Sequence, residues 1–148
     1  AEHLAMSEIE IEKLMLRCHG WFAAHDLPTP DLYVPPAWAM GRVSRTALQV
    51  SPFRYFEFQS GIYDSQTDCF QRLPLLGYEA DTELRAVFLA GFNALNAALA
   101  GFNGDIRMAI HPRDLEYFLR KRLLKNLQAC PISVTPAHLM GECSPVTA

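Results

Sequence analysis

The pattern of apolar positions predicts a helix over residues 7–25. Apolar side chains recur there three and four residues apart, at Ile11, Leu14, Met15, Cys18, Trp21 and Phe22. This spacing lines one face of an α-helix. Ser7 and Glu10 have the spacing of a capping box, in which each side chain binds the backbone N–H of the other residue. We therefore expect the helix to begin at Ser7 and to end before Asp26.

The following stretch favours short strands and turns. Asp31–Pro36 has the composition of a strand closed by two prolines, and residues 35–42 leave room for a single helical turn. Residues 46–59 are rich in β-forming side chains and are interrupted near Ser51. They predict two strands or one bent strand. No element is assigned to residues 61–81.

The second half of the chain predicts two helices and two strands. One helix spans Asp81–Gly104 with Asp81 as its N-cap, and Pro112 suits the first position of another that ends at Gln128. Residues 106–110 and 132–135 have the pattern of strands. A strand, a helix and a strand in close succession are typical of a βαβ unit with parallel strands.

Together these elements predict an α/β fold. We expect a small single domain in which a mixed sheet of about four or five short strands packs against three main helices. The alternative is an α+β fold with an antiparallel sheet. A chain of 148 residues suits one domain, placed at residues 7–140. A leader or expression remnant at 1–6 precedes it, and a C-terminal tail at 141–148 follows.

The helix expected at Asp81–Gly104 is unusual because residues 86–104 carry no charge. On a helical wheel its large side chains form one stripe: Leu84, Val87, Phe88, Phe92, Leu95, Leu99 and Phe102. The opposite face is small: Ala86, Ala90, Asn93, Ala94, Ala97 and Gly101. We expect the large stripe to face the protein's own core. The small face then needs a partner, which is either the first helix or the same helix of a second subunit.

The second of these partners predicts a homodimer. A two-fold axis brings the small face against itself and lets Asn93 hydrogen-bond its own copy. A membrane span is not expected, because Asn93, Asn96 and Asn103 interrupt a helix that is partly alanine.

The net charge and the cysteines limit which partners and which cellular location we expect for this protein. The net charge of −3 argues against a general nucleic-acid binder. The basic group Lys121, Arg122 and Lys125 is interpreted as a solvated helix face near a C-terminus. The chain begins without a secretion signal and its four cysteines form no CxxC pair, so we expect neither a disulfide framework nor export. The predicted location is cytoplasmic.

Candidate chemistry lies where the predicted parallel strands end, because ligands bind there in open α/β sheets. His111 and Arg113 follow one strand, Thr135 and His138 follow the other, and Trp38 is a candidate wall. His111 is a candidate acid or base, as histidine often is in enzymes, and Arg113 suits a carboxylate or phosphate. In the simpler interpretation His111 caps the third helix and Asp114 complements its dipole.

Other groups of side chains are weaker candidates for a metal site. Cys130, His138 and Cys143, or His19 with His25, do not have the spacing of a zinc site. The acidic residues Glu57, Asp64 and Asp68 have no lysine partner nearby and are interpreted as loop residues. Neither a metal nor a cofactor is expected.

The sequence therefore predicts a small soluble protein that associates with itself. Its expected function is that of a binding or interaction protein with a small anionic ligand at His111, Arg113, Trp38, Thr135 and His138. The alternative is a small enzyme in which His111 is the acid or base and Arg113 binds the anion.

Overall fold

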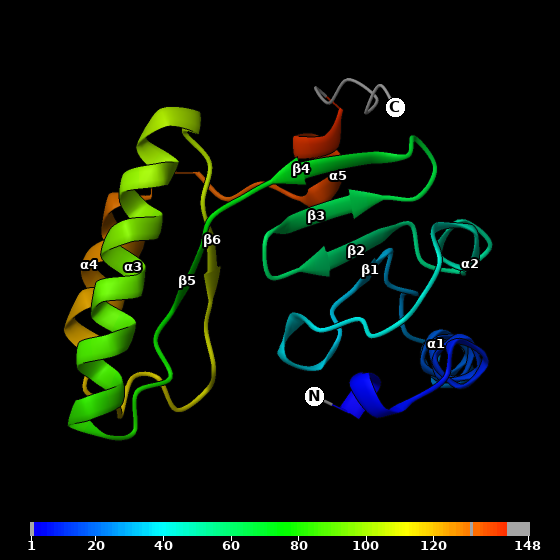
Figure 1. Ribbon diagram of the computed structural model, residues 1–148, viewed down its shortest axis with the longest axis horizontal. Coiled ribbons are helices and arrows are strands. Elements are labelled where there is room, and N and C mark those ends of the chain that lie inside the picture. Colours follow the sequence, from blue (N-terminus) through cyan, green and yellow to red (C-terminus); the bar gives the residue numbers. More distant parts are fainter. Residues whose placement is uncertain (1, 131, 142–148) are drawn as a thin grey trace. The chain divides into compact units, whose positions relative to one another are not determined.

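The structure of this protein is a computed structural model that describes residues 2–130 and 132–141 (Figure 1). Internal contacts divide the chain into two compact units. The first spans Ala1–Arg72 and Thr135–Ala148, and the second spans Leu73–Val134. The domain boundaries expected from the sequence, 7–140, remain a prediction.

The first unit begins with the 3₁₀ turn η1 (Glu2–Ala5) and the predicted helix α1 (Glu8–Ala24). Ser7 is the N-cap of α1, and the capping box with Glu10 is present. The backbone N–H of Ser7 donates to Glu10 Oε2 at 2.7 Å, and the N–H of Glu10 donates to Ser7 Oγ at 3.4 Å. Helix α1 therefore has the bounds that its sequence predicts.

A mixed sheet forms the centre of this unit. Its strands are β1 (Leu32–Tyr33), β2 (Tyr55–Phe58), β3 (Gly61–Asp64) and β4 (Cys69–Arg72), in that order. β1 runs parallel to β2, whereas β3 is antiparallel to both of its neighbours. The predicted α/β class with a mixed sheet and three main helices is confirmed.

Two short helical segments separate β1 from β2. The 3₁₀ turn η2 (Pro36–Trp38) is the single turn expected in that region. Of the two strands expected over residues 46–59, the second is present as β2, whereas the first is wrong, because Arg45–Gln49 forms helix α2. The side chain of Ser44 accepts a hydrogen bond from the N–H of Ala47, and its own N–H donates to Glu8 Oε1 at 2.8 Å. This N-cap outweighs the β-forming composition of the segment.

The core of the first unit is aromatic and aliphatic. Its buried members are Ile11, Met15, Tyr33, Met40, Leu48, Phe53, Phe56 and Tyr63. Beside it Arg54 Nη2 donates to Oδ2 of the fully buried Asp64 at 2.8 Å. Burial by itself raises the pKa of Asp64, but hydrogen bonds from Arg54 and from the N–H of Gln66 outweigh it and hold the pKa below its ordinary value.

The end of the described chain also belongs to the first unit, where Pro136–Met140 forms helix α5. The strand predicted over residues 132–135 is wrong, because these residues are not in a strand. Thr135 is instead the N-cap of α5, and its hydroxyl accepts from the N–H of His138. Threonine followed by proline is a helix-start signal, which the β-branched side chains of this segment obscured.

The cysteines differ from expectation in one respect. Cys69 in β4 is disulfide-bonded, whereas Cys18 and Cys130 are free. Disulfides are more typical of oxidising compartments than of the cytosol. The cytoplasmic location remains a prediction.

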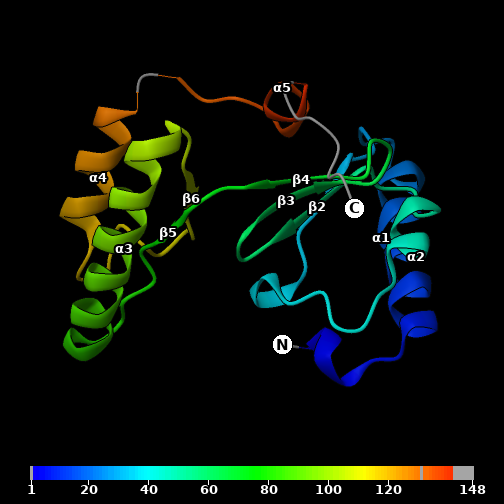
Figure 2. The ribbon, with the colours of Figure 1, turned by 45° about the horizontal axis from the view of Figure 1, so that its top comes forward.

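The second unit contains β5 (Leu75–Gly77), α3 (Glu83–Asn103), β6 (Arg107–Ala109) and α4 (Arg120–Ala129). β5 and β6 pair in parallel, with α3 between them in sequence. A βαβ unit is therefore present, but it lies one helix earlier than predicted. Figure 2 shows α3 and α4 side by side, with the two strands next to α3.

The third predicted helix starts late. Residues 112–119 form turns, and α4 begins only at Arg120. The carboxylate of Asp114 accepts the N–H of His111 at 2.8 Å, and the N–H of Asp114 donates to the carbonyl of His111 at 3.0 Å. These two bonds close a turn where Pro112 alone suggested a helix start.

The segment expected to be a leader contributes His3 to the core of the first unit. This side chain is 1% exposed, its ring stacks on Tyr33, and its Nε2 lies 3.1 Å from the Tyr33 hydroxyl. Its buried Nδ1 has no hydrogen-bond partner among the described residues. Gly41 has a φ of +77°, and a side chain there would collide with the carbonyl of His3. Burial lowers the pKa of His3 below its ordinary 6.5.

This lowered pKa predicts a loss of stability in mild acid. Since the folded state disfavours protonated His3, the unfolded chain binds more protons once the pH falls below about 6.5. The free energy of unfolding should therefore decrease from pH 7.5 to pH 5.5. In the variant His3→Gln, the free energy of unfolding should depend less on pH. Urea unfolding of the parent and the variant at pH 7.5 and pH 5.5 measures this difference. An unchanged slope in the variant would assign the dependence to other groups.

Candidate functional site

The inner face of α3 is fixed to the free edge of β5 by two asparagines. Asn93 Nδ2 donates to the carbonyl of Gly77 at 2.6 Å, and the N–H of Gly77 donates to Asn93 Oδ1 at 3.0 Å. Asn96 Nδ2 donates to the carbonyl of Leu75 at 2.8 Å. Residues 75 and 77 alternate with residue 76 along the strand, so these groups point away from β6. The asparagines therefore occupy the place of a neighbouring strand.

Small side chains make this close contact possible. Ala86 and Ala90 pack, together with Leu89, against a buried cluster of Leu76, Tyr78, Ala80, Leu119 and Leu123. Of the residues expected to mediate self-association, Asn93 is buried, while Ala94, Ala97 and Gly101 are exposed. The proposed bond between Asn93 and its own copy is wrong, because both polar atoms of the side chain bind Gly77.

The expected orientation of the large stripe is also wrong. Six large apolar side chains of α3 point outward, with exposed fractions between 39% and 71%: Leu84, Val87, Phe88, Phe92, Leu95 and Leu99. We call these residues the outer face of α3. Phe102, the seventh member of the predicted stripe, lies outside the described side chains. Of the small face, Ala86, Ala90 and Asn93 point toward the sheet, where side chains of this size let the asparagines reach β5.

The outer face of α3 is not flat. Gly91 has open space where a side chain would project, and Ala94 and Ala98 are exposed between the large residues. A hollow of about 260 Å³ adjoins this face and is lined by Glu79, Arg85, Phe88, Leu89 and Phe92. The face thus combines large projecting side chains with gaps between them.

By length and composition alone, Glu83–Gly101 could also cross a membrane. It is the one such helix in the part of the chain that the structure describes. The asparagine contacts of its inner face tie it to a β-strand. The absence of a membrane partner remains a prediction.

The predicted ligand residues fall into two groups. His111 and Arg113 share the turn after β6 in the second unit, as expected. Thr135 and His138 belong to the start of α5, and Trp38 belongs to η2, both in the first unit. The strand that was expected to place Thr135 and His138 beside His111 is not formed.

Within the turn, local contacts account for the polar side chains. Asp114 is fully buried and closes the turn, and His111 Nδ1 lies 3.7 Å from its Oδ2. Arg113 is exposed, pairs with Glu116 at 3.2 Å and lies over the Tyr117 ring. The simpler interpretation, in which His111 caps the third helix and Asp114 complements its dipole, is wrong, because α4 begins only at Arg120 and its N-cap is Leu119. A role of His111 and Arg113 in binding or catalysis remains a prediction.

The acidic residues considered as metal ligands have partners of other kinds. Asp64 pairs with Arg54, and Asp68 contacts Arg45 and Tyr63. Glu57 accepts from Trp38 Nε1 at 3.2 Å. Among the described residues, no three histidine, cysteine or acidic side chains gather as a metal site requires. Cys143 lies outside the described residues.

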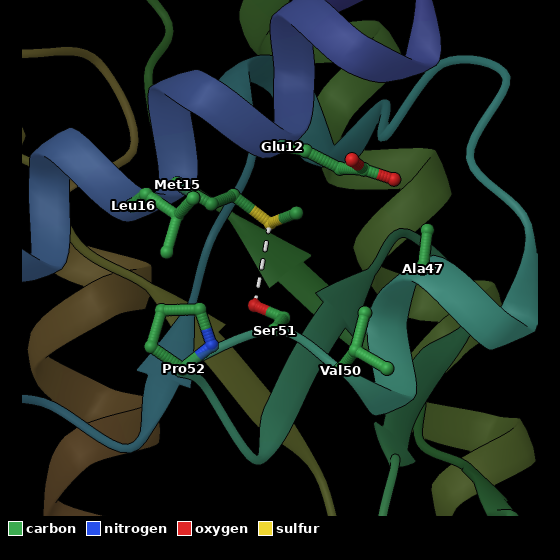
Figure 3. Close-up of a pocket in the computed structure, with 7 residues that line it drawn as sticks. All are labelled: Glu12, Met15, Leu16, Ala47, Val50, Ser51 and Pro52. Atoms are coloured by element: carbon green, nitrogen blue, oxygen red, sulfur yellow. Dashed lines mark hydrogen bonds between the residues drawn. The ribbon is translucent and has the colours of Figure 1, made fainter.

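A small pocket lies between α1 and α2 (Figure 3). Its lining is Glu12, Met15, Leu16, Ala47, Val50, Ser51 and Pro52. The hydroxyl of Ser51 donates to the sulfur of Met15 at 3.8 Å, which ties the loop after α2 to α1. The volume is about 70 Å³, far below the several hundred Å³ of ordinary ligand sites. The pocket is therefore a packing gap between the two helices.

Comparison with family models, with curated proteins and with solved structures finds no match to this chain.

The asparagine contacts predict a specific loss of stability. Asn93→Leu should lower the free energy of unfolding by about 2–4 kcal/mol, because it removes two hydrogen bonds and leaves the N–H and carbonyl of the half-buried Gly77 unpaired. Asn96→Ala removes one bond and should cost only about 1 kcal/mol. Urea unfolding of the two variants beside the parent measures both values. Equal effects would contradict the strand-like role of Asn93.

Proposed function

We propose that this protein is a self-associating interaction module and that the outer face of α3 is its dimer interface. The observation that carries the proposal is the exposure of six large apolar side chains on one helix. A soluble monomer rarely leaves a contiguous apolar patch of this size in water, and such patches mark interaction sites.

The size of the face agrees with a dimer interface. The exposed fractions of its six residues correspond to roughly 700 Å² of accessible surface, near the value of ~800 Å² that each partner buries in an ordinary stable interface. Leu84 and Leu99 are 15 residues apart, which is a length of roughly 22 Å along a helix. One copy of α3 is long enough to cover another.

A second copy of the chain is the occupant that fits best. The six residues are uncharged, so the face offers no charge pattern that selects a different protein. In a two-fold pair each helix presents the same projecting and recessed positions to the other. Large side chains such as Phe88 and Leu95 then fit the gaps at Gly91, Ala94 and Ala98, as ridges fit grooves in helix packing.

The alternative function, a small enzyme that uses His111 and Arg113, has less support. The buried carboxylate beside His111 closes a backbone turn, and Arg113 already pairs with Glu116. The binding of a small anion at this turn is a separate prediction that dimerisation does not require.

Two charge-introducing variants test the interface against a matched control. The double variant Phe88→Glu and Leu95→Glu should remain folded and convert the dimer to a monomer, because both side chains lie on the outer face. Ala90→Glu should unfold the second unit, because Ala90 packs against the buried cluster around Leu76 and Leu123. Sedimentation velocity gives the oligomeric state, and circular dichroism gives the fold.

A parent protein that sediments as a monomer at high micromolar concentration would overturn the proposal. So would a double variant that stays dimeric. Flotation of the parent with phosphatidylcholine vesicles, lost in the double variant, would assign the face to a membrane surface instead.

A further inference from the structure

A second hollow lies in the first unit, and its lining includes none of the ligand residues predicted from the sequence. Its volume is about 250 Å³, close to the lower limit for small-molecule sites. Three aromatic residues, Phe58, Tyr63 and Phe70, share its lining with Val43 and Leu48. Phe58 and Phe70 meet edge to face with ring centroids 6.1 Å apart. The walls therefore suit the ring of a small aromatic molecule.

One charged side chain, Arg45, belongs to this lining as the structure describes it. Its guanidinium carbon lies 6.0 Å from the centroid of the Tyr63 ring, and its Nη1 lies 3.4 Å from Asp68 Oδ1. The Tyr63 hydroxyl donates to the same oxygen of Asp68 at 2.7 Å. Burial and the neighbouring Asp68 raise the pKa of Tyr63 to about 12, so the phenol keeps its proton. Two contacts thus hold the guanidinium at the hollow before any ligand binds.

The lining of the hollow carries one positive charge, on Arg45, and the acidic partner Asp68 is not part of the lining. The carboxylate of Asp68 is engaged by both Tyr63 and Arg45, whereas a guanidinium has five N–H donors and the side chain of Arg45 is 64% exposed. A carboxylate accepts two of these donors in parallel, which an ammonium group or a neutral hydroxyl cannot do. A held cation beside aromatic walls is complementary to a ring that bears an acidic group.

We infer that the hollow between α2 and the β2–β4 strands is a binding site for a small aromatic carboxylate, with the ring against Phe58 and Phe70 and the carboxylate on Arg45. This site is independent of the outer face of α3, which belongs to the second unit. It is also distinct from the anion site that the sequence predicted at His111 and Arg113.

Phenylacetate is a suitable probe, with phenethylamine and 2-phenylethanol as the cationic and neutral counterparts. We expect saturable shifts of the backbone amide signals of Leu48, Tyr63 and Phe70 with phenylacetate, at a Kd of about 1 mM or lower for a ligand of this size. The two counterparts should bind at least about tenfold more weakly, because they lack the charge-assisted pair of hydrogen bonds.

Arg45→Met should weaken phenylacetate binding about tenfold. Arg42→Met is the matched control, since Arg42 is exposed in the same segment and is not part of the lining. If Arg45→Met does not fold, as judged from amide signals outside the hollow, Arg45→Gln takes its place. Equal binding of the three probes, an unaffected Arg45 variant, or shifts that do not saturate would each overturn the assignment.

Discussion

The second unit depends on the contact between the Asn93 side chain and the backbone of Gly77. A two-stranded parallel sheet leaves unpaired N–H and C=O groups along β5, and such an edge is costly unless something covers it. Asn93 offers a donor and an acceptor on a short stem, and both reach the same residue. The helix can approach closely enough because small residues, Ala86 and Ala90, occupy two of its inner positions.

The same contact determines which side chains of α3 meet the solvent. Once Asn93 points at β5, the rotation of the helix about its axis is fixed, and the large residues half a turn away must point outward. The apolar outer face is therefore a consequence of covering a strand edge with a helix. A sheet that covered its own edge would allow the phenylalanines and leucines to face inward.

Sequence patterns predicted an element correctly where neighbouring residues along the chain determine it. The capping box at Ser7 and the uninterrupted pattern after it gave the bounds of α1. The predictions failed where a side chain redirects the backbone, as Ser44 does for α2, Asp114 for the turn before α4 and Thr135 for α5. The inner and outer sides of α3 could not be predicted from hydrophobicity, because two polar residues decide them. The hollow at Arg45 was missed because its lining comes from four separate segments.

The packing of His3 has a mechanical consequence. Its ring is nearly parallel to the Tyr33 ring, with the centroids 5.9 Å apart, and its carbonyl occupies the space that a side chain at Gly41 would need. A pulling force on residues 2–5 would therefore act on β1 through Tyr33 as well as on α1 along the chain. The 3₁₀ turn η1 thus ties the segment before α1 to β1, the edge strand of the sheet.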